Sequence, residues 1–209
     1  MEKLLIFIKH RFGFLWRLIE WGNGLVFSLL FKARMEGLLP EQFRGTKSSP
    51  FSYRRLLPSD APALHDLIQS QEASDLRYFS PHDFDPDSIS KQFKKRSFLM
   101  MGAFDGEHLA GYFFLRFFAN KKCFVGRIID SSYRGKGMGN EMNRIMYQIA
   151  WGMGFRCLST MSKNNHAVIN AHKKNSTLRV LKELQNDYIL VEFMNPETKN
   201  HSRNAEKNI

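Results

Sequence analysis

Cysteine is scarce in this sequence, and long apolar runs are missing. Cys123 and Cys157 are the only two cysteines among 209 residues, and neither has a partner at metal-ligand spacing. The sequence therefore predicts neither a disulfide framework nor a zinc site, and we expect a cytoplasmic protein. The longest uncharged stretch, Trp21 to Phe31, is shorter than the about 20 apolar residues that a membrane-spanning helix needs. No internal repeat is visible.

Acidic residues are also few, with 20 Asp and Glu against 31 Lys and Arg and a formal net charge of +11. This imbalance indicates an anionic partner, which could be a nucleotide-like cofactor, a membrane surface or a nucleic acid. No nucleic-acid-binding motif is present, and the aromatic residues fall mostly at core-like positions, so we expect no nucleic-acid partner. A noncatalytic nucleic-acid- or membrane-binding module remains the alternative of a different class. The apolar content of 43% is sufficient for one well-buried domain.

The most informative stretch is Arg134 to Gly139, which reads Arg-Gly-Lys-Gly-Met-Gly between a strand-like run and a helix-like run. Glycines permit the backbone angles and close approach that a loop needs if its N–H groups are to converge on one anion. The N-terminus of the following helix adds partial positive charge, which favours a phosphate or pyrophosphate ligand. The alternative is a turn that uses glycine only to reverse direction.

Two common phosphate-binding loops do not fit this stretch. A P-loop requires Gly-Lys-Ser/Thr, whereas Lys136 here precedes Gly137 and no hydroxyl follows to hold magnesium. A dinucleotide-binding loop requires Gly-x-Gly-x-x-Gly and an acidic residue about 20 positions later. Here the spacing is Gly-x-Gly-x-Gly, and residues 159–163 contain no acid.

The stretch instead resembles the coenzyme A loop of the GNAT superfamily of N-acetyltransferases, with the pattern Arg/Gln-x-x-Gly-x-Gly/Ala after a strand. Arg134, Gly137 and Gly139 match this pattern. The resemblance covers roughly Phe51 to Met194 and implies acetyl-coenzyme A as the acyl donor. It implies that backbone N–H groups hold the pyrophosphate and that the preceding strand pairs with the pantetheine arm. The cofactor-binding residues that we expect are Ile128, Ile129, Arg134, Gly135, Lys136, Gly137, Met138, Gly139 and Asn165.

The apolar patterns predict a fold that agrees with this resemblance. A first strand at Phe51 to Leu57 is followed by two helices, and Asp105-Gly106 predicts a hairpin between the next two strands. Because antiparallel strands come first and crossover units later, we expect one α+β domain with a mixed, mostly antiparallel central sheet flanked by helices. The other strands are expected at 97–103, 109–118, 121–130, 155–161, 178–184 and 188–194. Helices are expected from residue 58, in a stretch that ends near residue 96, at 138–151 and at 164–175.

The N-terminal segment is unusual, because residues 1–36 combine a broad apolar face with a basic stripe. One interpretation is an amphipathic helix lying in the membrane interface at the inner face, with Trp16 and Trp21 at headgroup level. The other is a helix packed on the domain or on a second subunit. Charges split the apolar region and no small-residue cleavage site follows, so a signal peptide fits poorly. We expect a linker at 37–50, the acetyltransferase domain at 51–194 and a polar, disordered tail at 195–209.

A second segment extends the resemblance. In the superfamily an Asn opens the helix after the fifth strand, and a Tyr seven residues later protonates the departing thiolate. Asn165 and His172 occupy these positions, while Ser176-Thr177 replaces the usual Gly-Phe ending. Histidine can donate or accept a proton near neutral pH, so His172 is the candidate acid and the alternative is a solvated helix histidine.

The remaining chemistry requires a base and an oxyanion donor. His82, flanked by aromatic residues in the loop before the second helix, is the candidate base, and nearby Asp83 and Asp85 could bind a cationic acceptor. A backbone N–H at Ile128 or Ile129 is the expected oxyanion donor, worth roughly a hundredfold in rate. The sequence thus predicts N-acetyl transfer to a small-molecule amine by direct attack, without a metal. An amino sugar of surface polysaccharide is one hypothesis, and a protein lysine or N-terminus is the alternative acceptor.

Overall fold

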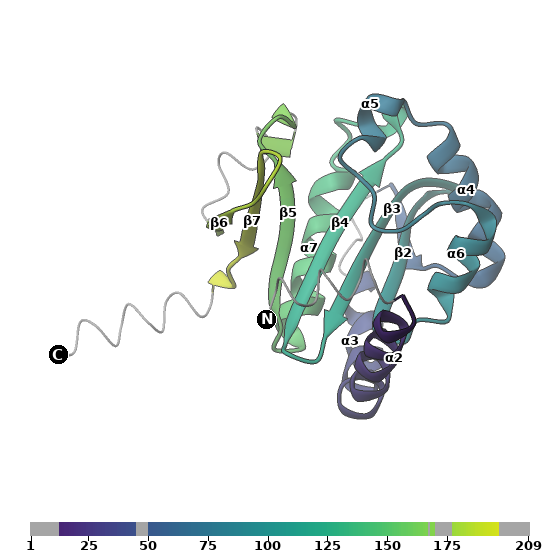
Figure 1. Ribbon diagram of the computed structural model, residues 1–209. Coiled ribbons are helices and arrows are strands. Elements are labelled where there is room, and N and C mark those ends of the chain that lie inside the picture. The colour runs from purple at the N-terminus through teal and green to yellow at the C-terminus, as the bar shows by residue number, and fades with distance from the viewer. Residues whose placement is uncertain (1–12, 45–49, 167, 170–176, 197–209) are drawn as a thin grey trace.

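The computed structural model describes residues 13–44, 50–166, 168–169 and 177–196 (Figure 1). Among these residues, seven strands form one sheet in the order β1-β2-β3-β4-β5-β7-β6. Every neighbouring pair is antiparallel except β4 and β5, which are parallel. The strands are β1 (Ser52–Arg55), β2 (Phe98–Asp105), β3 (His108–Phe118), β4 (Lys122–Ile129), β5 (Arg156–Ser162), β6 (Leu178–Glu183) and β7 (Tyr188–Phe193). The predicted mixed, mostly antiparallel α+β sheet is therefore confirmed.

Helices cover both faces of the sheet (Figure 1). One apolar core places α2, α3 and α7 against one face, with Phe27 and Ile145 fully buried. The other core places α4 and α6 against the opposite face, with Leu64 and Ile89 fully buried. The helices are α2 (Gly13–Leu30), α3 (Lys32–Arg44), α4 (Ala61–Gln69), α5 (Ala73–Leu76), α6 (Pro86–Phe93) and α7 (Met138–Gly152), and the 3₁₀ turns are η1 (Pro58–Asp60) and η2 (Ser131–Tyr133).

The expected N-terminal helical segment is present from Gly13 onward and is part of the domain core. Phe27 of α2 is fully buried, and its ring stacks on Phe117 of β3 with centroids 4.8 Å apart. Asn23 fixes the same helix through its side chain: its Nδ2 donates to Ser97 Oγ at 3.1 Å and to the Phe117 carbonyl at 2.9 Å, and its Oδ1 accepts from the Ala119 N–H at 2.8 Å. The helix α2 is therefore anchored by both apolar and polar contacts.

The predicted linker at 37–50 is wrong for residues 37–44, because α3 continues to Arg44, while residues 45–49 lie outside the described residues. Pro40 lies inside α3 and cannot donate a helical hydrogen bond, which is why the sequence suggested a break. Tertiary packing outweighs that loss. Leu39 is 5% exposed in the core that α3 shares with α7, and the Arg144 guanidinium of α7 donates to the Gln42 carbonyl at 2.8 Å.

Some expectations concern residues that the structure does not describe. The predicted polar tail is undescribed from residue 197 onward, and so are residues 1–12. Within the described part of the chain, no helix has the length and apolar content required to cross a bilayer.

Candidate active site

The glycine-rich loop lies between η2 and the N-terminus of α7, at the end of β4. Gly135 and Gly137 have φ angles of 76° and 83°, in the left-handed region that glycine adopts without strain. Gly137 is the N-cap residue of α7, whose 15 residues make this the N-terminus of a long helix. The predicted turn from strand to helix is therefore confirmed.

The loop presents a row of free donors. Among the described residues, the backbone N–H groups of Gly135 through Gly139 have no hydrogen-bond partner. The next two N–H groups, those of Asn140 and Glu141, donate back to the Gly137 carbonyl at 3.0 and 3.4 Å. Five consecutive unpaired N–H groups at a helix N-terminus form a site for an anion such as a pyrophosphate. Met138 contributes only its backbone, because its side chain is 1% exposed in the core.

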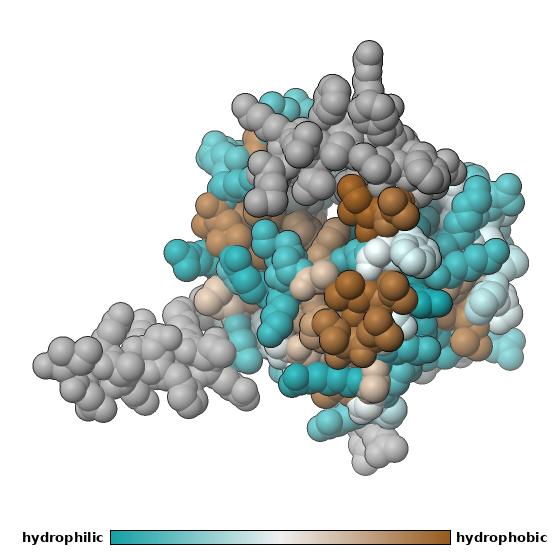
Figure 2. Space-filling model, turned by 60° about the horizontal axis from the view of Figure 1, so that its bottom comes forward, coloured by the Kyte–Doolittle hydropathy of each residue, from teal (hydrophilic) through white to brown (hydrophobic). Residues whose placement is uncertain are grey.

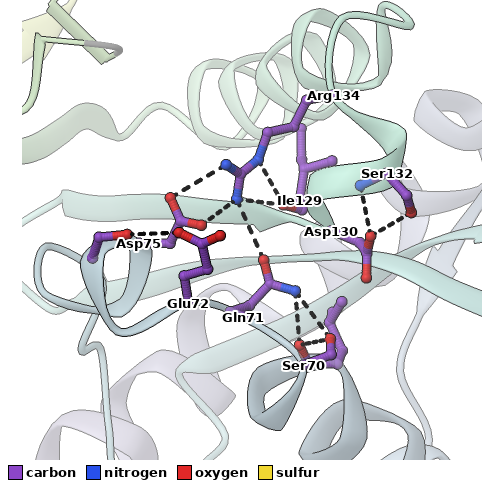
Figure 3. Close-up of polar contacts among 10 residues, drawn as sticks. Ser70, Gln71, Glu72, Asp75, Ile129, Asp130, Ser132 and Arg134 are labelled. Atoms are coloured by element: carbon purple, nitrogen blue, oxygen red, sulfur yellow. Dashed lines mark hydrogen bonds and ion pairs between the residues drawn. The ribbon is translucent and has the colours of Figure 1, made fainter.

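The two cations of the loop point in different directions. The Lys136 ammonium lies 4.8 Å from the centre of the Tyr133 ring, beside the free N–H groups. Arg134 turns away from them toward α5 (Figure 3). Its guanidinium donates to both carboxylate oxygens of Asp75, at 3.2 and 2.8 Å, and to Gln71 Oε1 at 3.4 Å. It also donates to the Ile129 carbonyl at 3.3 Å. Arg134 thus ties the loop to β4 and to the segment after α4.

A matched pair of variants tests this positioning role. We expect Arg134→Met to raise the KM for acetyl-coenzyme A about tenfold with a smaller change in kcat, because charge-assisted hydrogen bonds contribute roughly 1.5–3 kcal/mol. Arg54→Met is the control, since Arg54 makes a similar two-pronged pair with Asp60 and its side chain is equally exposed, at 45%. Steady-state kinetics should show an unchanged KM for the control, and equal KM values for both variants would contradict the assignment.

The strands β4 and β5 separate beside this loop. Their parallel ladder contains three residue pairs and ends at Phe124 and Leu158. At the point of separation the Ser159 hydroxyl donates to the Val125 carbonyl at 3.1 Å. The resemblance implied that these two strands splay apart to form a slot, and their ladder does end after three pairs. The binding of a pantetheine arm between them, in this slot, stays a prediction.

The pairing of β4 with β3 decides which backbone groups face the slot. The Asp130 N–H donates to the Ala110 carbonyl at 3.0 Å, and antiparallel neighbours alternate in direction. The N–H of Ile128 therefore points at β3, while the N–H groups of Arg127 and Ile129 point toward the slot. This corrects Ile128 as a candidate oxyanion donor and retains Ile129.

Arg127 is a site residue that the sequence analysis missed. Its side chain lies under the first turn of α7, where Nε donates to Asn143 Oδ1 at 2.8 Å. A Cβ built on Gly139 would come within 3.0 Å of the Arg127 guanidinium, so a side chain there would push that guanidinium aside. Burial lowers the pKa of Arg127. The signal available in the sequence was a charged residue inside an apolar strand.

A pocket of about 230 Å³ opens where β4 and β5 separate. It is lined by the loop Arg77 to Pro81, by β4 at Val125 and Gly126, and by residues that the sequence analysis also missed, among them Ser159, Thr160 and Tyr188. The only charged side chain among its described lining residues is Arg77. The aromatic loop was predicted to form the acceptor pocket, and part of that loop does line this cavity.

His82 lies behind this pocket with both ring nitrogens engaged. Its Nδ1 is 2.7 Å from the Asp83 carbonyl, and its Nε2 is 3.0 Å from the Tyr112 hydroxyl. Burial lowers the pKa of His82, which favours the neutral ring. In that form Nδ1–H donates to the carbonyl and Nε2 accepts from the tyrosine, so neither nitrogen is open to a substrate amine. The base assignment gains no support from this geometry and stays a prediction.

The other predicted residues are only partly described. Asn165 caps the helix that begins at His166, since its Oδ1 accepts from the Val168 N–H at 3.2 Å. Its side-chain amide nitrogen has no hydrogen-bond partner among the described residues. His172 lies outside the described residues, and its role as the acid remains a prediction.

Asp85 caps α6 by accepting from the Ser88 N–H at 2.9 Å, and Asp83 is exposed. Among the described residues, no cluster of His, Cys, Asp and Glu could hold a metal ion.

Comparisons with known proteins agree with this geometry. Solved structures with similar folds include an N-acetyltransferase, PaiA, from Thermoplasma acidophilum in complex with coenzyme A (15% identity, TM-score 0.59, 69% of this chain and 99% of that chain). The GNAT domain of PAT from S. lividans is similar at 13% identity (TM-score 0.59, 68% and 89%). An acetyltransferase from Salmonella typhimurium that modifies the N-terminal serine of a 50S ribosomal subunit protein is similar at 20% identity (TM-score 0.53, 68% and 91%).

At these identities the structural likeness establishes the fold, and the family assignment comes from the sequence. A comparison with curated protein sequences gives no match. The sequence profile of the Acetyltransferase (GNAT) family, however, matches residues 62–176, which is more than half of the chain and includes the glycine-rich loop and Asn165. The chain belongs to the GNAT family of acetyltransferases.

Proposed function

We propose that the protein transfers the acetyl group of acetyl-coenzyme A to a primary amine of a small, hydroxylated molecule. The observation that carries the donor assignment is the row of five free N–H groups from Gly135 to Gly139, which lies at the end of the slot between β4 and β5. A pyrophosphate bound there would leave the pantetheine arm to enter the slot. Asn165, at the start of the helix after β5, offers a further amide donor.

The pocket at the separation of β4 and β5 supports a small acceptor. Its volume of about 230 Å³ is below the range of about 300–1,000 Å³ that is common for ligand pockets. Five of its lining residues carry a hydroxyl group, namely Tyr78, Ser80, Ser159, Thr160 and Tyr188, and none of its described lining residues is a carboxylate. An amino sugar, unlike a lysine side chain, has hydroxyl groups of its own that such residues can hydrogen-bond. An amino sugar is therefore the acceptor class that we propose.

Direct attack of the amine on the thioester fits the described residues. Both cysteines are fully buried, and burial raises the pKa of each thiol, so neither provides a thiolate nucleophile. The Ile129 N–H, which points toward the slot, is the proposed donor to the oxyanion that forms as the amine adds to the thioester carbon. The tetrahedral intermediate then collapses and the C–S bond breaks. The amine nitrogen loses one proton to become the amide, and the departing thiolate takes up one proton to become the free thiol.

The acceptor can be identified by measuring thiol release from acetyl-coenzyme A with panels of amino sugars, amino acids and peptides. We expect release with amino sugars, and a product whose acetyl group withstands hydroxylamine, as an amide does and an ester does not. Release with peptides alone would favour the protein N-terminus or lysine instead. Release only with compounds that lack an amine would contradict N-acetylation.

A variant separates the acceptor pocket from the donor site. A Cβ built on Gly126 would lie 2.7 Å from the Phe114 ring, which lines the pocket. We expect Gly126→Val to narrow the pocket and to raise the KM for the acceptor at least tenfold, roughly 1.4 kcal/mol. The affinity for acetyl-coenzyme A should change less than threefold by calorimetry. A larger loss of donor affinity than of acceptor affinity would place the acceptor elsewhere.

A further inference from the structure

The helix α2 turns Phe27, Glu20 and Asn23 toward the domain and leaves most of its other large apolar side chains exposed. Glu20 faces the domain, where its carboxylate pairs with Arg116 and, at 3.3 Å, with the Lys95 ammonium. Asn23 also faces inward, as described above. The outward face from Leu18 to Leu30 carries no charged residue. An ordinary surface helix has the opposite arrangement, with an apolar stripe toward the core and charges toward water.

This outward face is exposed to an unusual degree. Trp21 is 64% exposed, Leu29 76% and Leu30 67%, and Leu18, Ile19 and Val26 are exposed as well. Figure 2, which brings this end of the molecule forward, shows brown hydrophobic side chains gathered in patches with teal hydrophilic side chains around them. Monomeric soluble proteins rarely expose contiguous apolar patches of this kind without a binding role.

A groove joins this face to a row of cations. Its volume is about 460 Å³, twice that of the acceptor pocket, and one wall is formed by α2 at Ile19, Trp21 and Leu25. The opposite wall is the segment Lys94-Lys95-Arg96 that precedes β2. Lys94 and Arg96 are exposed, and neither forms an ion pair with any described carboxylate. The groove thus combines an apolar wall with a cationic rim.

We propose that α2 and this groove dock the protein on an anionic phospholipid surface. An exposed apolar helix face with Trp and Leu, bordered by Lys and Arg, is the arrangement by which helices bind in the membrane interface. Anionic lipids attract nearby cations, and the chain has a net charge of +11. Exposed Lys32 and Arg34 at the start of α3 extend the cationic border.

Charge also argues against a second copy as the occupant of this face. A dimer formed through α2 would bring two sets of Lys94, Arg96, Lys32 and Arg34 together, and like charges at an interface oppose association. A bilayer with anionic headgroups complements the same cations. The residues before α2 continue its composition in sequence, with Leu4 to Ile8 apolar and Lys9 and Arg11 basic.

Vesicle co-sedimentation of the full chain tests the proposal. We expect binding to vesicles of phosphatidylcholine with about one third phosphatidylserine, and at least tenfold weaker binding to phosphatidylcholine alone or in high salt. The double variant Trp21→Glu/Leu29→Glu should bind the anionic vesicles at least tenfold more weakly. The control is Val180→Glu, because Val180 is 51% exposed on β6 and the substitution adds a negative charge to an exposed apolar position, one charge against two in the α2 variant. It should bind within twofold of the natural chain.

Two further measurements keep the test decisive. Lys94→Gln/Arg96→Gln should weaken binding to the anionic vesicles by more than tenfold, since each cation near the surface contributes about fivefold. Coenzyme A affinity should stay unchanged in all variants and verifies folding. Vesicle binding that the α2 variant does not reduce would overturn the proposal. The proposal would also be overturned if the natural chain did not bind the vesicles and instead formed a dimer, seen in sedimentation velocity, that the α2 variant dissociates.

Discussion

Gly137→Glu is expected to weaken the binding of acetyl-coenzyme A at least a thousandfold, roughly 4 kcal/mol. Two effects add at this position. Gly137 has a φ of 83°, where a residue with a side chain is strained by about 1–2 kcal/mol, so the loop tends to leave the geometry that aligns its N–H groups. The new carboxylate also lies at the helix N-terminus, where it would take the place of the anionic ligand and repel it. Calorimetry with coenzyme A measures the loss.

The matched control is Gly154→Glu, at the other end of α7. Gly154 has a φ of 76°, and nothing lies within 4 Å of a Cβ built on either glycine. The control therefore adds the same charge and similar strain about 20 Å away, because α7 rises about 1.5 Å per residue. Thermal unfolding should show similar destabilisation of both variants, and only Gly137→Glu should lose coenzyme A. Equal loss of affinity in both would mean that strain transmitted through α7 accounts for the effect and that the loop is not the anion site.

Phe27→Ala is expected to lower the free energy of unfolding by about 3–5 kcal/mol, the usual range for truncating a buried phenylalanine. The Phe27 ring is fully buried, stacks on Phe117, and meets Phe155 edge-on with centroids 6.4 Å apart. Its removal leaves a cavity between α2 and the sheet. Urea unfolding of the full chain measures the change, and the transition should remain single because α2 shares the domain core.

Leu29→Ala is the comparison on the same helix. Leu29 is 76% exposed, so its truncation should change the free energy of unfolding by less than about 0.5 kcal/mol. If Phe27→Ala lowered the free energy of unfolding no more than Leu29→Ala does, α2 would be detached from the domain in solution. Its apolar face would then have no fixed orientation relative to the domain.

The glycine-rich loop was predictable because its determinants are local. Three glycines, a preceding strand and a following helix lie within about 30 residues, and backbone geometry follows from residue type at such positions. The succession of strands and helices along the chain was also predictable, since alternation and the Asp105-Gly106 turn are short-range signals. The helix α3 was not, because Pro40 suggested a break and only contacts with α7 outweigh it.

The cavity that we propose as the acceptor pocket could not be predicted from the sequence, because its lining residues come together only in the folded structure. Ser159 and Tyr188 are 29 positions apart in the sequence and reach one cavity only because β5 pairs with β7. His82 was chosen for its residue type, but its hydrogen bonds depend on Tyr112, which the sequence could not place beside it. The direction of the Ile128 N–H likewise follows from register with β3, which a single sequence does not specify.

The separation of β4 from β5 gives this sheet an internal edge. An exposed strand edge invites pairing with other chains and hence aggregation, and proteins normally cover it or keep it short. Here the outer edges are β1 and β6, while the edges that open beyond Phe124 and Leu158 lie in the middle of the sheet. A strand from another protein cannot easily reach them there, whereas a narrow, flexible ligand with amide groups can. The sheet therefore keeps strand-pairing capacity for a small molecule while protecting it from self-association.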